Sequence, residues 1–137
     1  MNPVLFLRIA SVLTFVHAVL HTIGGVFSKP DSGAQEATMT VMKSTQFPVM
    51  GAIRSYGDFY LGFGLFVSVA LLMESIVFWQ LGSLAKTEAA RLRPLMATFL
   101  FGYLAFAVIS GTYFFPAPVI NEVLIASCIG LAIWSSK

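Results

Sequence analysis

Four stretches of the sequence are long and apolar enough to cross a lipid bilayer, and they limit the possible folds more than any other feature. They run over about residues 4–27, 56–84, 94–115 and 118–134. The hydrocarbon core of a bilayer is about 30 Å thick and requires roughly 20 apolar residues in a helix. The sequence therefore predicts an all-α protein, a four-helix bundle embedded in a membrane.

The composition supports a membrane protein and argues against other classes. Hydrophobic residues make up 58% of the chain and charged residues only 10%, whereas soluble domains are about half apolar and about a quarter charged. The eight Lys and Arg residues are scattered, so no basic stripe for nucleic acid is expected. Cys128 is the single cysteine, which excludes an intramolecular disulfide and a cysteine metal cluster.

The first and last stretches each leave an alternative open. The first resembles a signal peptide in position, but its apolar core is longer than the typical 7–15 residues of such a peptide, so we expect a retained helix. The fourth stretch is short and is interrupted near its start by Asn121 and Glu122. Three complete spans and a partial one therefore remain an alternative to four.

The polar segment 28–54 separates the first two stretches and is too long for a tight turn. It is rich in Ser, Thr, Ala and Met. We expect a short helix at about residues 34–45 that lies on the outer membrane surface.

The distribution of Lys and Arg predicts the orientation, because basic loops near helix ends stay in the cytoplasm. With four spans, one side of the membrane carries Arg8, Lys86, Arg91, Arg93 and Lys137, and the other carries Lys29, Lys43 and Arg54. Five cations against three place both termini in the cytoplasm.

His17 and His21 are the only histidines, and their spacing of four residues places them on one face of the first helix. The plainer interpretation is contact with neighbouring helices through polar side chains. Two histidines at this spacing can also hold a metal ion, but the Glu beside the first His of zinc-protease helices is replaced by Ala18. Metal is therefore not favoured, a single haem cannot use both rings, and proton handling or contact with an organic ligand remains open.

Glu74 lies deep in the second stretch, where a carboxyl group must be protonated or paired. At 1.5 Å per residue, Glu74 and Arg8 fall on the same side of the bilayer midplane. The sequence therefore predicts an Arg8–Glu74 ion pair. It would dock two helices, or serve as a gate or a proton-coupled carboxylate.

Two further patterns occur at the start of the second stretch. Ser55 and Asp58 have the spacing of a capping box; an outer polar cluster of Arg54 and Asp58, with Glu122, is the alternative. Tyr60 and Phe63 share a face with Glu74. That face would either bind a flat apolar ligand such as a quinone, lipid or sterol, or form an ordinary interfacial aromatic belt.

Two segments, "LRIASVLTFVHAVLHTIGG" and "IRSYGDFYLGFGLFVSVALL", resemble small, uncharacterised four-helix bacterial membrane proteins. Arg54, Gly57, Gly62 and Gly64 follow the pattern of the DoxX-like group, in which an Arg-led, Gly-rich segment opens a helix. The resemblance covers somewhat under half of the chain. It implies a four-helix bundle in a bacterial cytoplasmic membrane and assigns no catalytic residue.

The sequence favours a non-enzymatic role, because it contains no nucleotide-binding loop and places no nucleophile beside a base. We expect a small multi-pass membrane protein that binds an apolar or quinone-like ligand, or that acts as a homodimer or a subunit of a membrane complex. One alternative is a proton-coupled transporter that uses Glu74. Another is a membrane-embedded redox or isomerase enzyme that uses His17, His21 and Glu74. No cofactor is indicated.

Overall fold

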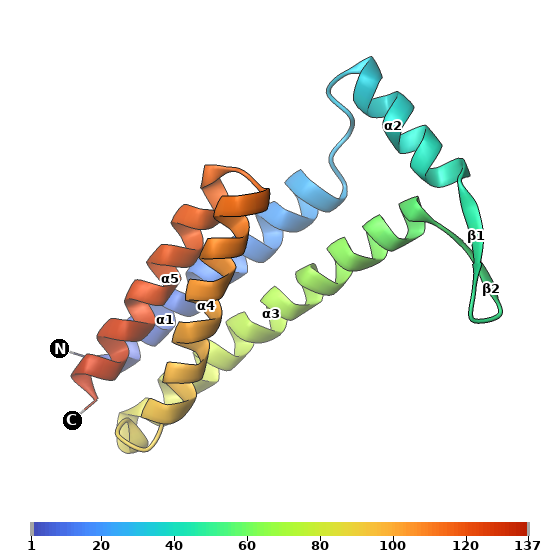
Figure 1. Ribbon diagram of the computed structural model, residues 1–137. Coiled ribbons are helices and arrows are strands. Elements are labelled where there is room, and N and C mark those ends of the chain that lie inside the picture. Colours follow the sequence, from blue (N-terminus) through green and yellow to red (C-terminus); the bar gives the residue numbers. More distant parts are fainter. Residues whose placement is uncertain (1, 137) are drawn as a thin grey trace. The chain divides into compact units, whose positions relative to one another are not determined.

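The computed structural model describes residues 2–136, which are mostly helical (Figure 1). In chain order the elements are α1 (Pro3–Leu20), the π-helix η1 (His21–Val26), α2 (Gly33–Ser44), β1 (Gln46–Val49), β2 (Ala52–Ser55), α3 (Tyr56–Glu88), α4 (Arg93–Tyr113) and α5 (Pro116–Ser135). The all-α prediction is confirmed for this part of the chain, apart from one two-stranded hairpin. Lys137, which contributes to the predicted charge asymmetry, lies outside the described residues.

Four helical segments within residues 2–136 are long and apolar enough to cross a membrane. They are Pro3–Val26, Tyr56–Glu88, Arg93–Tyr113 and Pro116–Ser135, close to the stretches expected from the sequence. Proline lies in the first turn of both α4 and α5, where its missing N–H has no helical partner to lose. With 20 residues, α5 has the length of a complete span, in spite of Asn121 and Glu122.

The chain forms two compact units, and the boundaries between them fall inside α1 and α3. Unit 1 contains Met1–His17 and Leu71–Lys137, and unit 2 contains Ala18–Ala70. Each unit is described by itself below.

Unit 1 has a core to which four helical segments contribute. The buried apolar residues are Leu7 and Ala10 of α1, Phe78, Leu81 and Ala85 of α3, Met96 and Tyr103 of α4, and Ile125, Ala126, Ile129 and Ala132 of α5. The Phe78 ring packs edge-on against Phe99, with centroids 5.0 Å apart, and also contacts Tyr103. Aromatic and aliphatic side chains therefore join all four segments in one cluster.

Unit 2 contains α2, the hairpin and the first half of α3. The helix expected at residues 34–45 is confirmed as α2, whose N-cap Ser32 accepts a hydrogen bond from Gln35 N. β1 and β2 pair antiparallel, and the turn between them has positive φ at Met50 (46°) and Gly51 (87°). Positive φ at both central residues is the mark of a type I′ hairpin turn.

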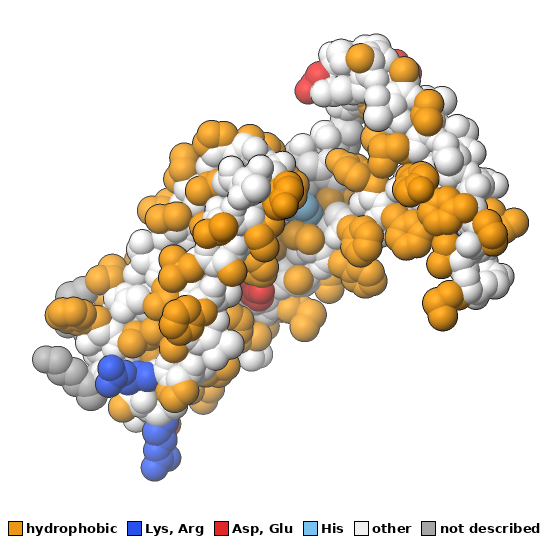
Figure 2. Space-filling model, viewed as in Figure 1, with side chains coloured by type: hydrophobic (Ala, Val, Ile, Leu, Met, Phe, Trp, Pro, Cys, Tyr) orange, Lys and Arg blue, Asp and Glu red, His pale blue; other side chains and the backbone are white. Residues whose placement is uncertain are grey.

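Large apolar side chains cover much of the surface of each unit (Figure 2). In unit 1 they include Phe101, 71% exposed, and Trp134, 76% exposed. The interior of the same unit holds hydroxyl and carboxyl groups, including Ser11, Thr14 and Glu122. Unit 1 therefore has both an apolar core and a largely apolar surface, with polar groups buried between its helices.

The packing of α2 against the start of α3 depends on Gly57. A Cβ atom on Gly57 would lie 2.9 Å from Lys43 Cγ and 3.2 Å from Lys43 Cα, whereas one on Gly62 would meet no atom within 4 Å. We expect Gly57→Ala to lower the free energy of unfolding by about 1–3 kcal/mol, because a methyl group must be forced against backbone.

Thermal unfolding of the purified protein in detergent, followed by circular dichroism, measures this change. Gly62→Ala is the matched control on the same helix, and it should leave stability unchanged or raise it by about 0.5–1 kcal/mol. Equal effects of the two substitutions would contradict the predicted close packing at Gly57.

Candidate functional site

A chain of hydrogen bonds in unit 1 joins three helical segments. Tyr103 Oη of α4 lies 2.6 Å from Glu74 Oε2 of α3 and 3.2 Å from Thr14 Oγ1 of α1. Thr14 in turn donates to Ala10 O at 2.9 Å. Tyr103 is 1% exposed and Thr14 is 0% exposed. The chain therefore lies inside unit 1, and Glu74 forms its partly accessible end.

A second carboxyl group is buried in the same unit. Glu122 of α5 is 5% exposed, and its Oε1 accepts a hydrogen bond of 2.9 Å from Ser110 Oγ of α4. Its Oε2 is buried and has no hydrogen-bond partner among residues 2–136. Glu122 also interacts electrostatically with Tyr103. Two carboxyl groups, from α3 and α5, thus act on one phenol.

Ser11 and Ser75 fix the register of α1 against α3 within unit 1. Ser11 Oγ donates to Ser75 O at 2.7 Å, and Ser75 Oγ donates to Ser11 O at 2.9 Å. Hydroxyl groups that bond across helices are a common means of association where no water competes.

The predicted Arg8–Glu74 ion pair is wrong. Arg8 Nη2 instead donates to Ser83 Oγ at 2.8 Å, and its guanidinium carbon lies 3.5 Å from the centre of the Trp79 ring. A Cβ atom on Gly82 would lie 3.2 Å from Arg8 Nε. The absence of a side chain at Gly82 thus leaves room for the arginine stem.

The direction of the Arg8 side chain explains the error. Side chains of a helix point toward its N-terminus, and α1 runs antiparallel to α3, since Ser11 pairs with Ser75 while Arg8 pairs with Ser83. The guanidinium therefore extends toward the C-terminal end of α3, away from Glu74. The partner of Glu74 is Tyr103. Its hydroxyl group is a polar group within the uncharged part of the third span, and this was the signal in the sequence that could have identified it.

The two histidines fall in different units. His21 begins η1 in unit 2, and its Nε2 lies 3.0 Å from Gly64 O of α3. The next residue of η1, Thr22, donates to Ser68 Oγ at 2.8 Å. Both contacts match the plainer interpretation of His21 as a residue of a helix contact. His17 belongs to unit 1. Within residues 2–136, no three His, Cys, Asp or Glu side chains are grouped so that they could hold a metal ion.

The capping box predicted at the start of α3 is formed. Ser55 N donates to Asp58 Oδ2 at 2.8 Å, and Asp58 N donates to Ser55 Oγ at 3.1 Å. The pair thereby satisfies N–H groups that lack a partner in the first turn of a helix. The Nη1 of Arg54 donates to the carbonyl oxygen of Ile53 at 2.8 Å, and the charge of Arg54 also acts on Asp58.

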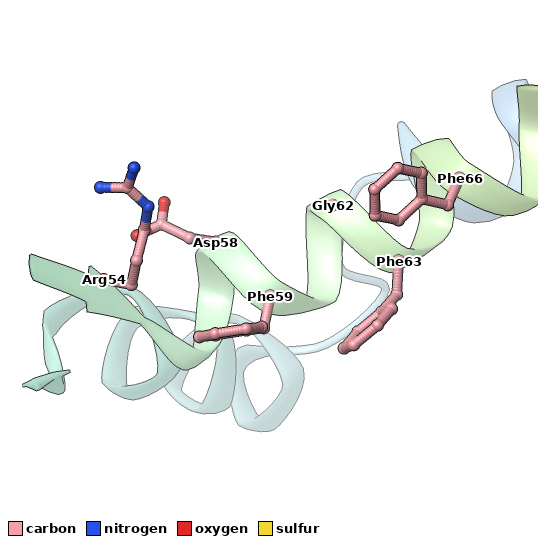
Figure 3. Close-up of a pocket in the computed structure, with 6 residues that line it drawn as sticks. All are labelled: Arg54, Asp58, Phe59, Gly62, Phe63 and Phe66. Atoms are coloured by element: carbon pink, nitrogen blue, oxygen red, sulfur yellow. The ribbon is translucent and has the colours of Figure 1, made fainter. Parts of the chain in front are cut away.

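A shallow groove of about 220 Å³ runs along the first three turns of α3 (Figure 3). It is lined by Arg54, Asp58, Phe59, Gly62, Phe63 and Phe66. In Figure 3, Arg54 and Asp58 extend to the same side of the helix, and the rings of Phe59 and Phe63 follow each other along it. Of the two aromatic residues predicted to bind a ligand, Phe63 lines the groove and Tyr60 does not.

A double-mutant cycle tests the partners of Arg8. We expect Arg8→Gln and Trp79→Leu to be coupled by about 0.5–2 kcal/mol, because either substitution removes the same contact between the guanidinium and the indole ring. Arg8→Gln and Glu74→Gln should be additive, because the two side chains share no partner. The measurement is the free energy of unfolding in detergent. Stronger coupling of Arg8 to Glu74 than to Trp79 would instead support the Arg8–Glu74 ion pair that the sequence predicts.

Comparison of the chain with known protein families, curated proteins and solved structures finds no match. The resemblance to the DoxX-like group therefore stays a prediction.

Proposed function

We propose that the protein is a small multi-pass membrane protein that crosses the bilayer with Pro3–Val26, α3, α4 and α5. The observation that carries this proposal is the largely apolar surface of unit 1, together with the polar groups buried inside it. Phe101, Val108 and Trp134 are each at least 70% exposed, whereas hydroxyl and carboxyl groups are buried. Soluble monomers rarely expose apolar patches of more than a few hundred Å². Lipid chains are a surrounding in which such a surface is stable.

The proposal includes the orientation expected from the charges and the inner membrane implied by the resemblance to the DoxX-like group. Three cations lie at or near the α3–α4 connection: Lys86 in the last turn of α3, Arg91 in the connection and Arg93 at the start of α4. Basic residues in short connections favour the cytoplasmic side. Both termini would then lie in the cytoplasm and α2 on the opposite side, at the inner membrane.

Membrane insertion can be tested by extraction. We expect the expressed full-length protein to stay in the membrane pellet after washing at alkaline pH and high salt, and to enter the supernatant only with detergent. Alkaline washing removes proteins that are held by charge, whereas it leaves membrane-spanning helices in place. Release of the protein by alkali alone would contradict the proposal.

We further propose that the groove on α3 binds a quinone-like ligand, with a flat apolar ring and carbonyl oxygens. The rings of Phe59 and Phe63, whose centroids are 6.1 Å apart, together with Phe66, offer a surface on which a flat ring can stack. Arg54 has guanidinium donors left beyond the one bonded to Ile53. They can donate to a carbonyl oxygen. An anionic head is less favoured, because Asp58 lies on the same side of the helix as Arg54 (Figure 3).

The size of the groove limits what it can hold. Pockets that enclose a drug-sized ligand measure about 300–1,000 Å³, and this groove measures about 220 Å³. It therefore suits one ring, while an attached isoprenoid tail would lie along the apolar surface of the helix. The groove supports ligand binding over the other roles considered: a subunit of a complex, a transporter that uses Glu74, and an enzyme that uses His17, His21 and Glu74.

Binding of a short-tailed benzoquinone to the protein in detergent micelles tests this assignment. We expect Phe63→Ala to weaken binding by roughly 2- to 10-fold, which corresponds to the loss of one aromatic contact of about 0.5–1.5 kcal/mol. Arg54→Gln should weaken binding as well, because it removes a charged donor. Isothermal titration calorimetry gives the dissociation constants.

Phe101→Ala is the matched control, because Phe101 is also a highly exposed phenylalanine but belongs to α4 in unit 1. It should leave the dissociation constant unchanged. Equal weakening by Phe63→Ala and Phe101→Ala, or no saturable binding by the unmodified protein, would refute the groove as a quinone site.

A further inference from the structure

The contacts around Tyr103 require more hydrogen atoms than an ionised Glu74 leaves available. Three contacts lie in a row: Glu74 Oε2 to Tyr103 Oη at 2.6 Å, Tyr103 Oη to Thr14 Oγ1 at 3.2 Å, and Thr14 Oγ1 to Ala10 O at 2.9 Å. Each hydroxyl group has one hydrogen. Because the carbonyl of Ala10 can only accept, Thr14 donates there. The single hydrogen of Tyr103 is then left to serve two contacts.

A proton on Glu74 supplies the missing hydrogen. The carboxylic acid then donates to Tyr103 Oη, Tyr103 donates to Thr14 Oγ1, and Thr14 donates to Ala10 O. Each contact has one hydrogen, and each donor has one acceptor. Without that proton, Tyr103 donates to Glu74, and the contact between Tyr103 and Thr14 has no hydrogen.

We propose that Glu74, Tyr103 and Thr14 form a proton-binding site inside unit 1, in which protonation of Glu74 turns the O–H of Tyr103 from Glu74 to Thr14. Binding a proton at α3 thereby reverses the hydrogen bond between Glu74 of α3 and Tyr103 of α4, and it forms one from Tyr103 to Thr14 of α1. The site depends on the contacts of unit 1 and is independent of the quinone groove.

The charged groups around the site favour one bound proton. On α5, Glu122 brings a second carboxyl group to act on Tyr103, and two negative charges beside one phenol disfavour each other in an apolar interior. On α1, Arg8 is bonded to Ser83 and stacked on Trp79, and His17 follows Thr14 by one turn. Arg8 is thereby bonded to residues of α3 other than Glu74.

The structure also indicates why Glu74 holds the proton rather than Glu122. Glu74 Oε2 contacts a hydroxyl group that can either donate or accept, so both forms of the acid have a partner there. At Glu122 the contact of Oε1 with Ser110 Oγ is supplied by the hydroxyl hydrogen of Ser110 and needs no added proton, and an O–H on the other oxygen would have no acceptor among the described residues.

Infrared difference spectroscopy of the full-length protein in lipid vesicles tests the proposal as the pH is changed. We expect a carboxylic acid C=O band that shifts in D₂O, persists in Glu122→Gln and is lost in Glu74→Gln. Tyr103→Phe should keep the band but move it to higher frequency, because the acid has lost its acceptor. Thr14→Val should change the tyrosine C–O band and leave the acid in place.

Three results would overturn the proposal. The first is the absence of a protonated carboxyl band at any pH at which circular dichroism shows the folded protein. The second is a band that disappears in Glu122→Gln and persists in Glu74→Gln. The third is a band unaffected by Tyr103→Phe. Should Glu74→Gln fail to fold, Glu74→Asp replaces it: the shortened acid should keep a C=O band, shifted to the frequency of a more weakly bonded group, and an unshifted band would overturn the proposal.

Discussion

The hydrogen bonds of the Tyr103 phenol are the interaction on which the arrangement of unit 1 depends. The phenol oxygen contacts the hydroxyl group of Thr14 in α1 and the carboxyl group of Glu74 in α3. Its ring packs against Phe78 and Phe106. Polar groups surrounded by hydrocarbon must find partners within the protein. A single buried hydroxyl group thus determines how three helical segments can be rotated about their axes, and the Ser11–Ser75 pair determines how far two of them can slide.

The features that the sequence predicted correctly are local ones. The helical segments follow from the length and hydropathy of each stretch, and prolines in the first turns of α4 and α5 mark their starts. The helix α2 and the Ser55–Asp58 capping box depend on residues a few positions apart. Such patterns depend on interactions within one short segment, so they can be predicted without knowing how the helices pack.

The features that the sequence did not predict depend on the rotation and register of one helix against another. Depth alone placed Arg8 near Glu74, but the direction of the arginine side chain led it to Trp79. The role of Tyr103 requires the position of α4. Among the aromatic residues that line the groove, the sequence predicted Phe63 as a candidate ligand contact but not Phe59 or Phe66. The hairpin was hidden because its turn uses Met50 at positive φ, where Asn or Gly is usual.

The π-helix η1 changes how the first span presents its side chains. Its closing hydrogen bond joins Phe27 N to Thr22 O, five residues apart, at 3.0 Å. Relative to an α-helix, such a turn acts as one inserted residue and shifts the phase of everything after it by about 100°. A helical wheel drawn through the whole span therefore assigns Val26 to the wrong side. Deleting one residue of η1 would restore the α-helical phase, and Val26 would then turn away from Gly64, which it now contacts.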